Sequence, residues 1–203
     1  MNKDIETIGA KPTGLKGKIA GQVMNIIHSA LYKKIIAKYI IHSTKISPKL
    51  TVLDIGCGGG IAIKIFSSHP SIQKVCGIDY SVDMVKLSMK LNKREIENET
   101  VEIVKADILK IPYKNDFFDI ITCFDTINFW TDHNEALNEI KRVLKRNGRV
   151  YIINAYPKEG TKWHNFVKFK NNGEYERLFT NNGFIKIISE FEKNTIIVSG
   201  YKS

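Results

Sequence analysis

The chain has 203 residues, of which 43% are hydrophobic and 26% charged, so its composition is that of one folded α/β domain and excludes a disordered segment. Its formal net charge of +10 permits a nucleic-acid or anionic-lipid partner, but the lysines are spread over several segments and match a general Lys, Asn and Ile bias equally well. The polar N-terminus and the lysines that interrupt the longest apolar run predict neither a secretory signal nor a membrane span, and hence a cytoplasmic protein.

The first predicted element is a long amphipathic helix over residues 15–42. Ile19, Val23, Ile27 and Leu31 recur at four-residue intervals, with lysines between them, which is the spacing of one apolar helix face. We therefore divide the chain into an N-terminal helical lid segment, residues 1–48, and a compact domain over residues 49–203.

Beyond this helix, short β-branched runs alternate with longer helical patterns, which is typical of βαβ units and a mostly parallel sheet. The predicted strands are Thr51–Ile55, Lys74–Asp79, Thr100–Ala106, Phe117–Phe124, Val150–Ala155, Phe184–Glu190 and Thr195–Tyr201. Four further helices are predicted. The first covers residues 61–68, and the second is capped by Ser81 and Asp83 and ends at Arg94. The third covers residues 133–149 and is closed by Asn147-Gly148, and the fourth covers residues 174–180. Since the dipeptide Lys193-Asn194 joins the last two strands, the parallel sheet is expected to end in a hairpin.

A glycine-rich turn, within the stretch VLDIGCGGG at residues 52–60, follows the first strand. Such a turn lets backbone approach a ligand closely, because no Cβ stands in the way. Asp54, Asp79 and Asp107 lie at the ends of the first three strands, so their carboxylates are expected to meet at one crevice. A dinucleotide fits poorly, because Asp54 would repel its pyrophosphate and Ile61 stands where the G-x-G-x-x-G fingerprint needs a last glycine or alanine.

A ligand with positive charge near the turn and a ribose further along fits better, and S-adenosylmethionine has that form. Its amino-acid end is expected along the backbone from Gly56 to Gly60, near Asp54. Asp79 is expected to accept hydrogen bonds from both ribose hydroxyls, since a carboxylate offers two acceptor oxygens. Asp107 would meet the adenine amino group, with Ile108 and Met84 on the ring faces.

Four stretches closely resemble class I S-adenosylmethionine-dependent methyltransferases: VLDIGCGGG, GIDYSVDMV, VKADILKIPYKNDFFDIITCFDTINFW and EIKRVLKRNGRVYIIN. The similarity is greatest to the small-molecule branch that includes the ubiquinone and menaquinone biosynthesis enzymes, and it covers residues 51–154. The resemblance implies a Rossmann-like, doubly wound α/β sheet of seven strands in the order 3-2-1-4-5-7-6, with strand 7 antiparallel. It also implies cofactor contacts from Asp54, Gly56, Cys57, Gly58, Asp79, Tyr80, Met84, Ala106, Asp107, Ile108 and Phe124.

Methyl transfer from a sulfonium demands no fixed catalytic residue, because the leaving group is built into the cofactor and a general base is needed only if the acceptor must lose a proton. Asp125, just past the fourth strand, and His28, on the N-terminal helix beside Asn25, Ser29 and Tyr32, are the candidate catalytic residues. The alternative role for Asp125 is structural, as a cap of the following turn. The alternative for His28 is that it is only a residue of the helix surface.

Other polar and aromatic residues have both a functional and a structural interpretation. Phe129 and Trp130 could wall an acceptor pocket, although aromatic core is the favoured role. His133 is expected to be exposed, or influenced by the helix dipole, at a helix start, with catalysis as the lesser alternative. Trp163 and His164 could line the acceptor side or anchor the surface. The three cysteines form no CxxC pair and no metal-ligand cluster, so we expect buried thiols and no metal.

Three functions remain open. The favoured one is methylation of a small molecule in a pocket built from the N-terminal helix and residues 156–172. A nucleic-acid or protein acceptor is supported by the charge, but FDTI lacks the [DNS]-PP-[FYW] motif, Cys123 lacks a preceding proline, and little chain lies outside the core. A regulatory protein that binds S-adenosylmethionine without catalysis is the third. The oligomeric state is not predicted.

Overall fold

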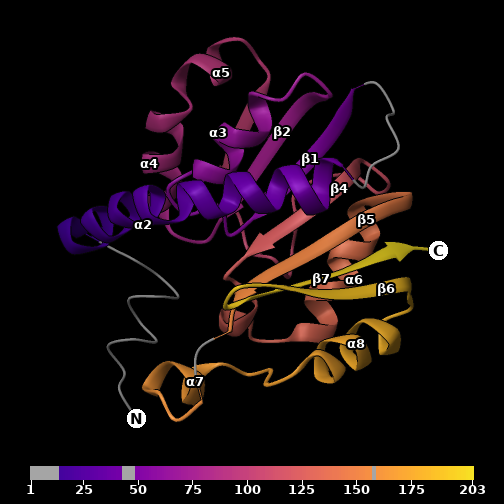
Figure 1. The fold of residues 1–203 in the computed structure, drawn as a ribbon. Coiled ribbons are helices and arrows are strands. Elements are labelled where there is room, and N and C mark those ends of the chain that lie inside the picture. Colours follow the sequence, from indigo (N-terminus) through magenta and orange to yellow (C-terminus); the bar gives the residue numbers. More distant parts are fainter. Residues whose placement is uncertain (1–13, 43–48, 157–158) are drawn as a thin grey trace. The chain divides into compact units, whose positions relative to one another are not determined.

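The computed structural model describes residues 14–42, 49–156 and 159–203, and its strands form one seven-stranded sheet in the order β3-β2-β1-β4-β5-β7-β6 (Figure 1). The strands are β1 (Leu50–Ile55), β2 (Ile72–Asp79), β3 (Val101–Lys105), β4 (Phe118–Phe124), β5 (Leu144–Ala155), β6 (Phe184–Glu192) and β7 (Thr195–Lys202). Strand β7 runs antiparallel to both β5 and β6. The predicted strand order and terminal hairpin are therefore confirmed. The chain divides into two compact units, one up to Asp107 and one from Ile108, which are described in turn.

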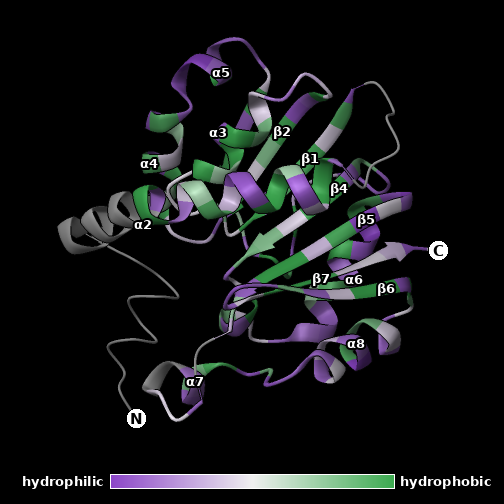
Figure 2. Cartoon of the chain, viewed as in Figure 1, coloured by the Kyte–Doolittle hydropathy of each residue, from purple (hydrophilic) through white to green (hydrophobic). Residues whose placement is uncertain are grey.

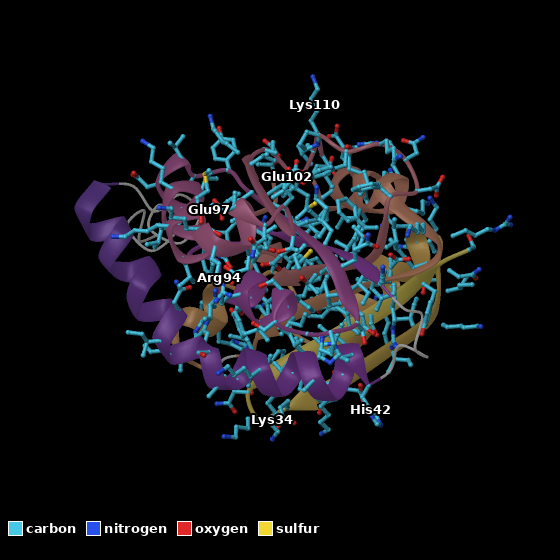
Figure 3. The ribbon with its side chains drawn as sticks, turned by 90° about the horizontal axis from the view of Figure 1, so that it is seen from above. Lys34, His42, Arg94, Glu97, Glu102 and Lys110 are labelled. Carbon is cyan, nitrogen blue, oxygen red and sulfur yellow. The ribbon has the colours of Figure 1, made fainter. Side chains whose placement is uncertain are left out.

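The first unit begins with helix α2 (Gly14–Ile35), which continues as the π-helical segment η1 (Ile36–Ile41). The predicted long helix is confirmed over the described part of its range. Helix α2 packs against α3 and α4, and its large apolar residues from Tyr32 to Ile40 are buried. The predicted apolar face is wrong at Ile27, which is 65% exposed. On the polar face, the side chains of Lys34 and His42 point away from the ribbon (Figure 3).

The rest of the first unit consists of the strands β1, β2 and β3 and the helices α3 (Ile61–Ser67), α4 (Val82–Leu91) and α5 (Lys93–Glu97). The paired strands β1 and β2 are parallel, as are β2 and β3, and their central residues are largely hydrophobic (Figure 2). Ser81 caps α4 by accepting a hydrogen bond from Met84 N, as predicted. The single helix predicted up to Arg94 is wrong, because it breaks at Asn92, whose side-chain amide donates to Ser88 O and Gly60 O.

The second unit contains β4, η2 (Ile127–Phe129), α6 (His133–Val143), β5, α7 (Lys162–Phe166), α8 (Asn172–Asn181), β6 and β7. Asp132 caps α6 by accepting hydrogen bonds from the backbone N–H groups of Asn134 and Glu135, both at 2.9 Å. The short helix α7 is not among the helices predicted from the sequence.

The predicted helix over residues 133–149 is also wrong at its C-terminal end. Helix α6 stops at Val143, and β5 begins at Leu144, which is fully buried and pairs with Phe118. Between Leu144 and Arg149 the β4–β5 register shifts, so Asn147, with a φ of 60°, belongs to a bulge and not to a helix stop. Burial of Leu144 outweighs the helix propensity of the basic residues that follow it.

Among the helices of the described ranges, none is both long and apolar enough to cross a membrane. In the same ranges no three His, Cys, Asp or Glu side chains are grouped so that they could hold a metal ion.

Candidate functional site

The glycine turn occupies the residues from Gly56 to Gly60, between the end of β1 and the start of α3. The N–H groups of Gly56 and Cys57 both donate to Ile78 O, at 2.8 and 3.0 Å, which fixes the turn to β2. Gly56, Gly58 and Gly60 have φ angles of 68°, 51° and 86°. These left-handed values favour glycine, because a Cβ would crowd the following carbonyl.

Asp79, at the end of β2, accepts hydrogen bonds from the turn and from the start of α4. Its Oδ2 accepts from Gly58 N and its Oδ1 from Ser81 N, each at 2.8 Å. Burial raises the pKa of the Asp79 carboxyl, and these two hydrogen bonds oppose the rise. Each oxygen keeps a further lone pair, so the carboxylate can still accept a hydrogen bond from a ligand. The sequence analysis identified Asp79 but missed its contact with Gly58.

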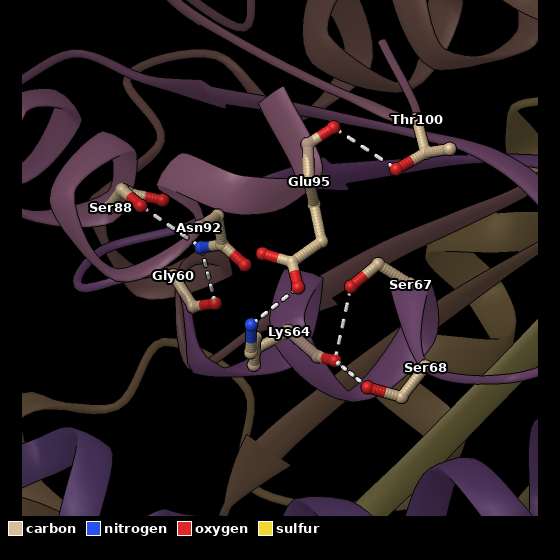
Figure 4. A network of polar contacts seen from close by, with 8 residues as sticks. All are labelled: Gly60, Lys64, Ser67, Ser68, Ser88, Asn92, Glu95 and Thr100. Atoms are coloured by element: carbon tan, nitrogen blue, oxygen red, sulfur yellow. Dashed lines mark hydrogen bonds and ion pairs between the residues drawn. The ribbon is translucent and has the colours of Figure 1, made fainter. Parts of the chain in front are cut away.

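Two asparagines hold the other side of the turn. Asn25 Nδ2, on α2, donates to Gly59 O at 2.9 Å, and Asn92 Nδ2 donates to Gly60 O at 3.2 Å (Figure 4). The sequence analysis did not assign either contact, because each joins residues more than 30 positions apart. No local motif signals such a pair.

The distances from a Cβ built on Gly58, Gly59 or Gly60 to the nearest atoms show which of these three positions is open. A Cβ on Gly59 would lie 2.5–2.8 Å from the Asn25 side-chain amide, and one on Gly60 would lie 2.9 Å from Ser88 Cα. A Cβ on Gly58 would have Gly56 O as its nearest neighbour, at 4.0 Å. Gly58 is therefore the position where the turn offers open backbone to a ligand.

A polar network behind the turn joins α3 to α5 (Figure 4). Lys64 Nζ lies 2.5 Å from Glu95 Oε1, and the hydroxyls of Ser67 and Ser68 donate to Lys64 O. The Lys64 ammonium lowers the pKa of Glu95, whose backbone carbonyl accepts from Thr100 Oγ1 at 3.0 Å. These contacts fix the helix that starts directly after Gly60.

Cys57, inside the turn, is a buried thiol. Burial raises its pKa, and the negative charges of Asp79 and Asp54 raise it further. Both carboxylates therefore act on the same thiol, which agrees with the predicted approach of the ends of β1 and β2. The thiol stays neutral and is unsuited to act as a nucleophile.

The remaining predicted cofactor residues differ in exposure. Asp54 and Met84 are each only 2% exposed, whereas Tyr80 is half exposed, with Lys105 Nζ 6.0 Å from its ring centroid. Ala106 N donates to Asp79 O at 3.1 Å, which places the end of β3 beside that of β2, and Asp107 is exposed. In the second unit, Ile108 is half-buried and Phe124 is buried.

The two candidate catalytic residues lie in different units. In the first unit, His28 Nδ1 is 3.0 Å from Tyr32 Oη, which pairs the two side chains along α2. In the second unit, Asp125 has a φ of 55°, its N–H donates to Ile153 O, and its Oδ1 accepts from Ala155 N. The Asp125 carboxylate therefore ties the end of β4 to β5, and the alternative of a cap for the following turn is replaced by this cross-strand contact.

The exposed position expected for His133 is wrong, because its ring is half-buried. Its Nε2–H donates to Ile127 O, and the ring lies 5.1 Å from Phe169, centroid to centroid. Burial, followed by the charge of Lys168, lowers the pKa of His133. Trp130 is 4% exposed, which confirms its core role.

Other residues considered from the sequence belong to the second unit. Phe129 packs on Phe166, with ring centroids 5.5 Å apart. His164 is half-buried and its N–H donates to Thr161 Oγ1. The side chain of Trp163 lies outside the described residues.

The core of the second unit also holds polar atoms that the sequence analysis missed. Tyr175 is fully buried and Asn154 is 2% exposed. Tyr175 Oη and Asn154 Oδ1 have no hydrogen-bond partner within the described part of the chain, although the two residues are close enough for Asn154 to moderate the burial-driven rise in the Tyr175 pKa.

Comparison with known proteins agrees with the fold and with the turn. Residues 53–152 match the family model described as a methyltransferase domain. The ubiquinone/menaquinone biosynthesis C-methyltransferase UbiE of Geotalea daltonii is 32% identical over 117 residues, which are 57% of this chain and 50% of that protein. The uncharacterized methyltransferase YcgJ of Bacillus subtilis is 33% identical over 121 residues, 59% of this chain and 46% of that protein. The chain thus spans about half the length of the curated relatives it matches.

Among solved structures, a putative S-adenosyl-L-methionine-dependent methyltransferase from Methanococcus maripaludis has the same fold, with a TM-score of 0.75 and 22% identity over 92% of this chain and 93% of that one. The strand order and the glycine turn define the fold class of Rossmann-like methyltransferases. Residues 53–152 thus form a domain of the methyltransferase family, and the chain is similar to class I S-adenosylmethionine-dependent methyltransferases of the ubiquinone and menaquinone type.

Proposed function

We propose that this chain binds S-adenosylmethionine at the glycine turn and transfers its methyl group to a small-molecule acceptor. The observation that carries the proposal is the open backbone at Gly58, directly beside the half-buried Asp79 carboxylate. The turn is held on its other sides by Asn25 and Asn92, so this shape exists before any ligand binds.

In this proposal, the amino-acid end of the cofactor lies along the backbone from Gly56 to Gly60, near Asp54. The free lone pairs of Asp79 accept hydrogen bonds from the ribose hydroxyls. Tyr80, Ala106 and Asp107 line the adenine side, and Met84, which is buried, packs under it. Ile108 and Phe124, in the second unit, stay predicted contacts.

The cofactor supplies a sulfonium leaving group, so the C–S bond breaks as the bond to the acceptor forms and a neutral thioether remains. The task of the protein is to orient the acceptor and to exclude water. Asp125 and His28 are proposed as acceptor-side residues, and each would serve as a general base only for an acceptor that must lose a proton. Cys57, as a neutral buried thiol, is not proposed as a nucleophile and stays a predicted cofactor contact.

Calorimetric titration tests the cofactor. Adenosylhomocysteine is expected to bind and NAD is not, because the Asp54 and Asp79 carboxylates repel a pyrophosphate. Asp79→Ala should reduce adenosylhomocysteine affinity at least tenfold, whereas Lys33→Ala, an exposed change on α2, should not alter it. NAD binding in place of adenosylhomocysteine would reject the proposal.

The acceptor class is tested by incubating the protein with methyl-labelled cofactor and a cell extract. We expect label in low-mass compounds, because UbiE of Geotalea daltonii, named for quinone biosynthesis, is a relative at 32% identity. The competing acceptor is a polymer, which the net charge of +10 favours. Label in RNA or protein, with strong heparin retention that falls steeply with salt, would select that alternative. Cofactor binding without transfer of label would support the third function, a regulatory protein that binds S-adenosylmethionine without catalysis.

A further inference from the structure

Asn25 differs from the other groups that hold the glycine turn. Asp79 and Asn92 belong to the elements that follow the turn, whereas Asn25 lies 34 residues before Gly59, on the helix that precedes the sheet. Its Nδ2 donates to Gly59 O at 2.9 Å, and α2 packs on α3 and α4 beside it. All of these residues belong to the first unit.

The same contact explains why position 59 is a glycine. Three glycines of this turn, Gly56, Gly58 and Gly60, have a left-handed φ. Gly59 does not, so its φ does not require a glycine. A Cβ at position 59 would lie 2.5 Å from Asn25 Nδ2 and 2.7 Å from Asn25 Oδ1. The Asn25 side chain therefore fills the space that a side chain at position 59 would need. A glycine at position 59 leaves this space to Asn25.

We propose that Asn25 is a positioning residue that couples the docking of α2 to the ligand-binding shape of the glycine turn. This inference rests on the proposed function, because it assumes that the turn binds the cofactor. Asn25 holds the peptide between Gly59 and Gly60, one residue beyond Gly58, the position with open surroundings. By thermodynamic reciprocity, a ligand that favours the held turn must also favour the docked helix.

A double-mutant cycle tests the coupling. Asn25→Ala and Gly59→Ala should each weaken adenosylhomocysteine binding about threefold to tenfold, the range for one lost hydrogen bond. The double variant should bind no more weakly than Asn25→Ala, because the atoms that the new Cβ would meet are gone. Asn25→Asp keeps the size of the side chain and removes the donor, so it should match Asn25→Ala even if the alanine variant folds poorly. Lys33→Ala is the control.

A second readout separates positioning from simple stabilisation. Adenosylhomocysteine should slow amide hydrogen exchange over residues 26–35 in the unaltered chain and in Lys33→Ala, and this protection should be lost in Asn25→Asp. If the Asn25 variants merely lower the melting temperature and keep both affinity and protection, or if the cycle is additive, the coupling is refuted while the proposed function stands. If the unaltered chain binds no adenosylhomocysteine, the proposed function fails first and the coupling fails with it.

Discussion

The glycines of the turn serve three different physical needs at the scale of single residues. Gly56 and Gly58 provide left-handed backbone, Gly59 leaves room for Asn25, and Gly60 requires both a left-handed φ and space beside Ser88. Gly58 combines a left-handed conformation with open surroundings, whereas Gly60 does not. Substitutions at neighbouring glycines should therefore change the unfolding free energy and the ligand affinity to different extents.

Gly58→Ala should cost about 1 kcal/mol of unfolding free energy, from the left-handed conformation alone, but weaken adenosylhomocysteine binding strongly. Gly60→Ala adds a clash with Ser88 Cα and Asn92 Nδ2, so it should cost about 3 kcal/mol. Urea unfolding and calorimetry measure the two effects. Equal destabilisation by both changes would contradict the difference in surroundings.

The buried hydroxyl of Tyr175 gives a second prediction for a single residue. Because its Oη has no partner among the described residues, Tyr175→Phe removes an unsatisfied polar atom from the core. The variant should be as stable as the unaltered chain or more stable by about 1 kcal/mol. A thermal melt checks this, and a clear loss of stability would show that the hydroxyl is satisfied, by Asn154 or by a buried water.

At the scale of elements, side chains near helix ends decide where helices start and stop. Ser81 begins α4 as the sequence predicts, and Asp132 begins α6, since each caps the N–H groups of the first turn. The ends are decided by partners distant in sequence. Asn92 stops α4 by turning its amide to Gly60 O, and Leu144 leaves α6 to pair with Phe118 in the sheet.

The cap of α6 can be tested alone because Asp132 is exposed. Asp132→Ala should lower the unfolding free energy by about 1 kcal/mol, as the N–H groups of Asn134 and Glu135 lose their acceptor. Asp132→Asn keeps an acceptor oxygen and should lose much less. The same loss in both variants would show that charge near the helix start matters more than the hydrogen bonds.

At the scale of the whole molecule, the half-buried Asp79 makes stability depend on pH. Its pKa in the folded chain is raised above the ordinary value of 3.8 by burial, so the folded state binds this proton more tightly than the unfolded state. The contribution of Asp79 to stability is therefore fully present below the unfolded pKa and is lost as the pH rises through the raised pKa.

This dependence is measured as a difference between two chains. The unfolding free energy of the unaltered chain minus that of Asp79→Asn should fall as the pH is raised from about 3.8, since only the carboxyl titrates. The other carboxyl groups are common to both chains and cancel. A difference that rises with pH would mean that the hydrogen bonds from Gly58 and Ser81 outweigh burial.

The sequence by itself determined the alternation of strands and helices, the seven-strand order through the family resemblance, and the acids at the strand ends, because periodicity and glycine-rich turns are local signals. It could not determine why Gly59 is a glycine, where α4 and α6 end, or that His133 is half-buried. Only the tertiary structure decided these points. Each depends on a contact between residues far apart in the chain, such as Asn25 with Gly59 or Phe118 with Leu144, and such contacts leave no periodic trace.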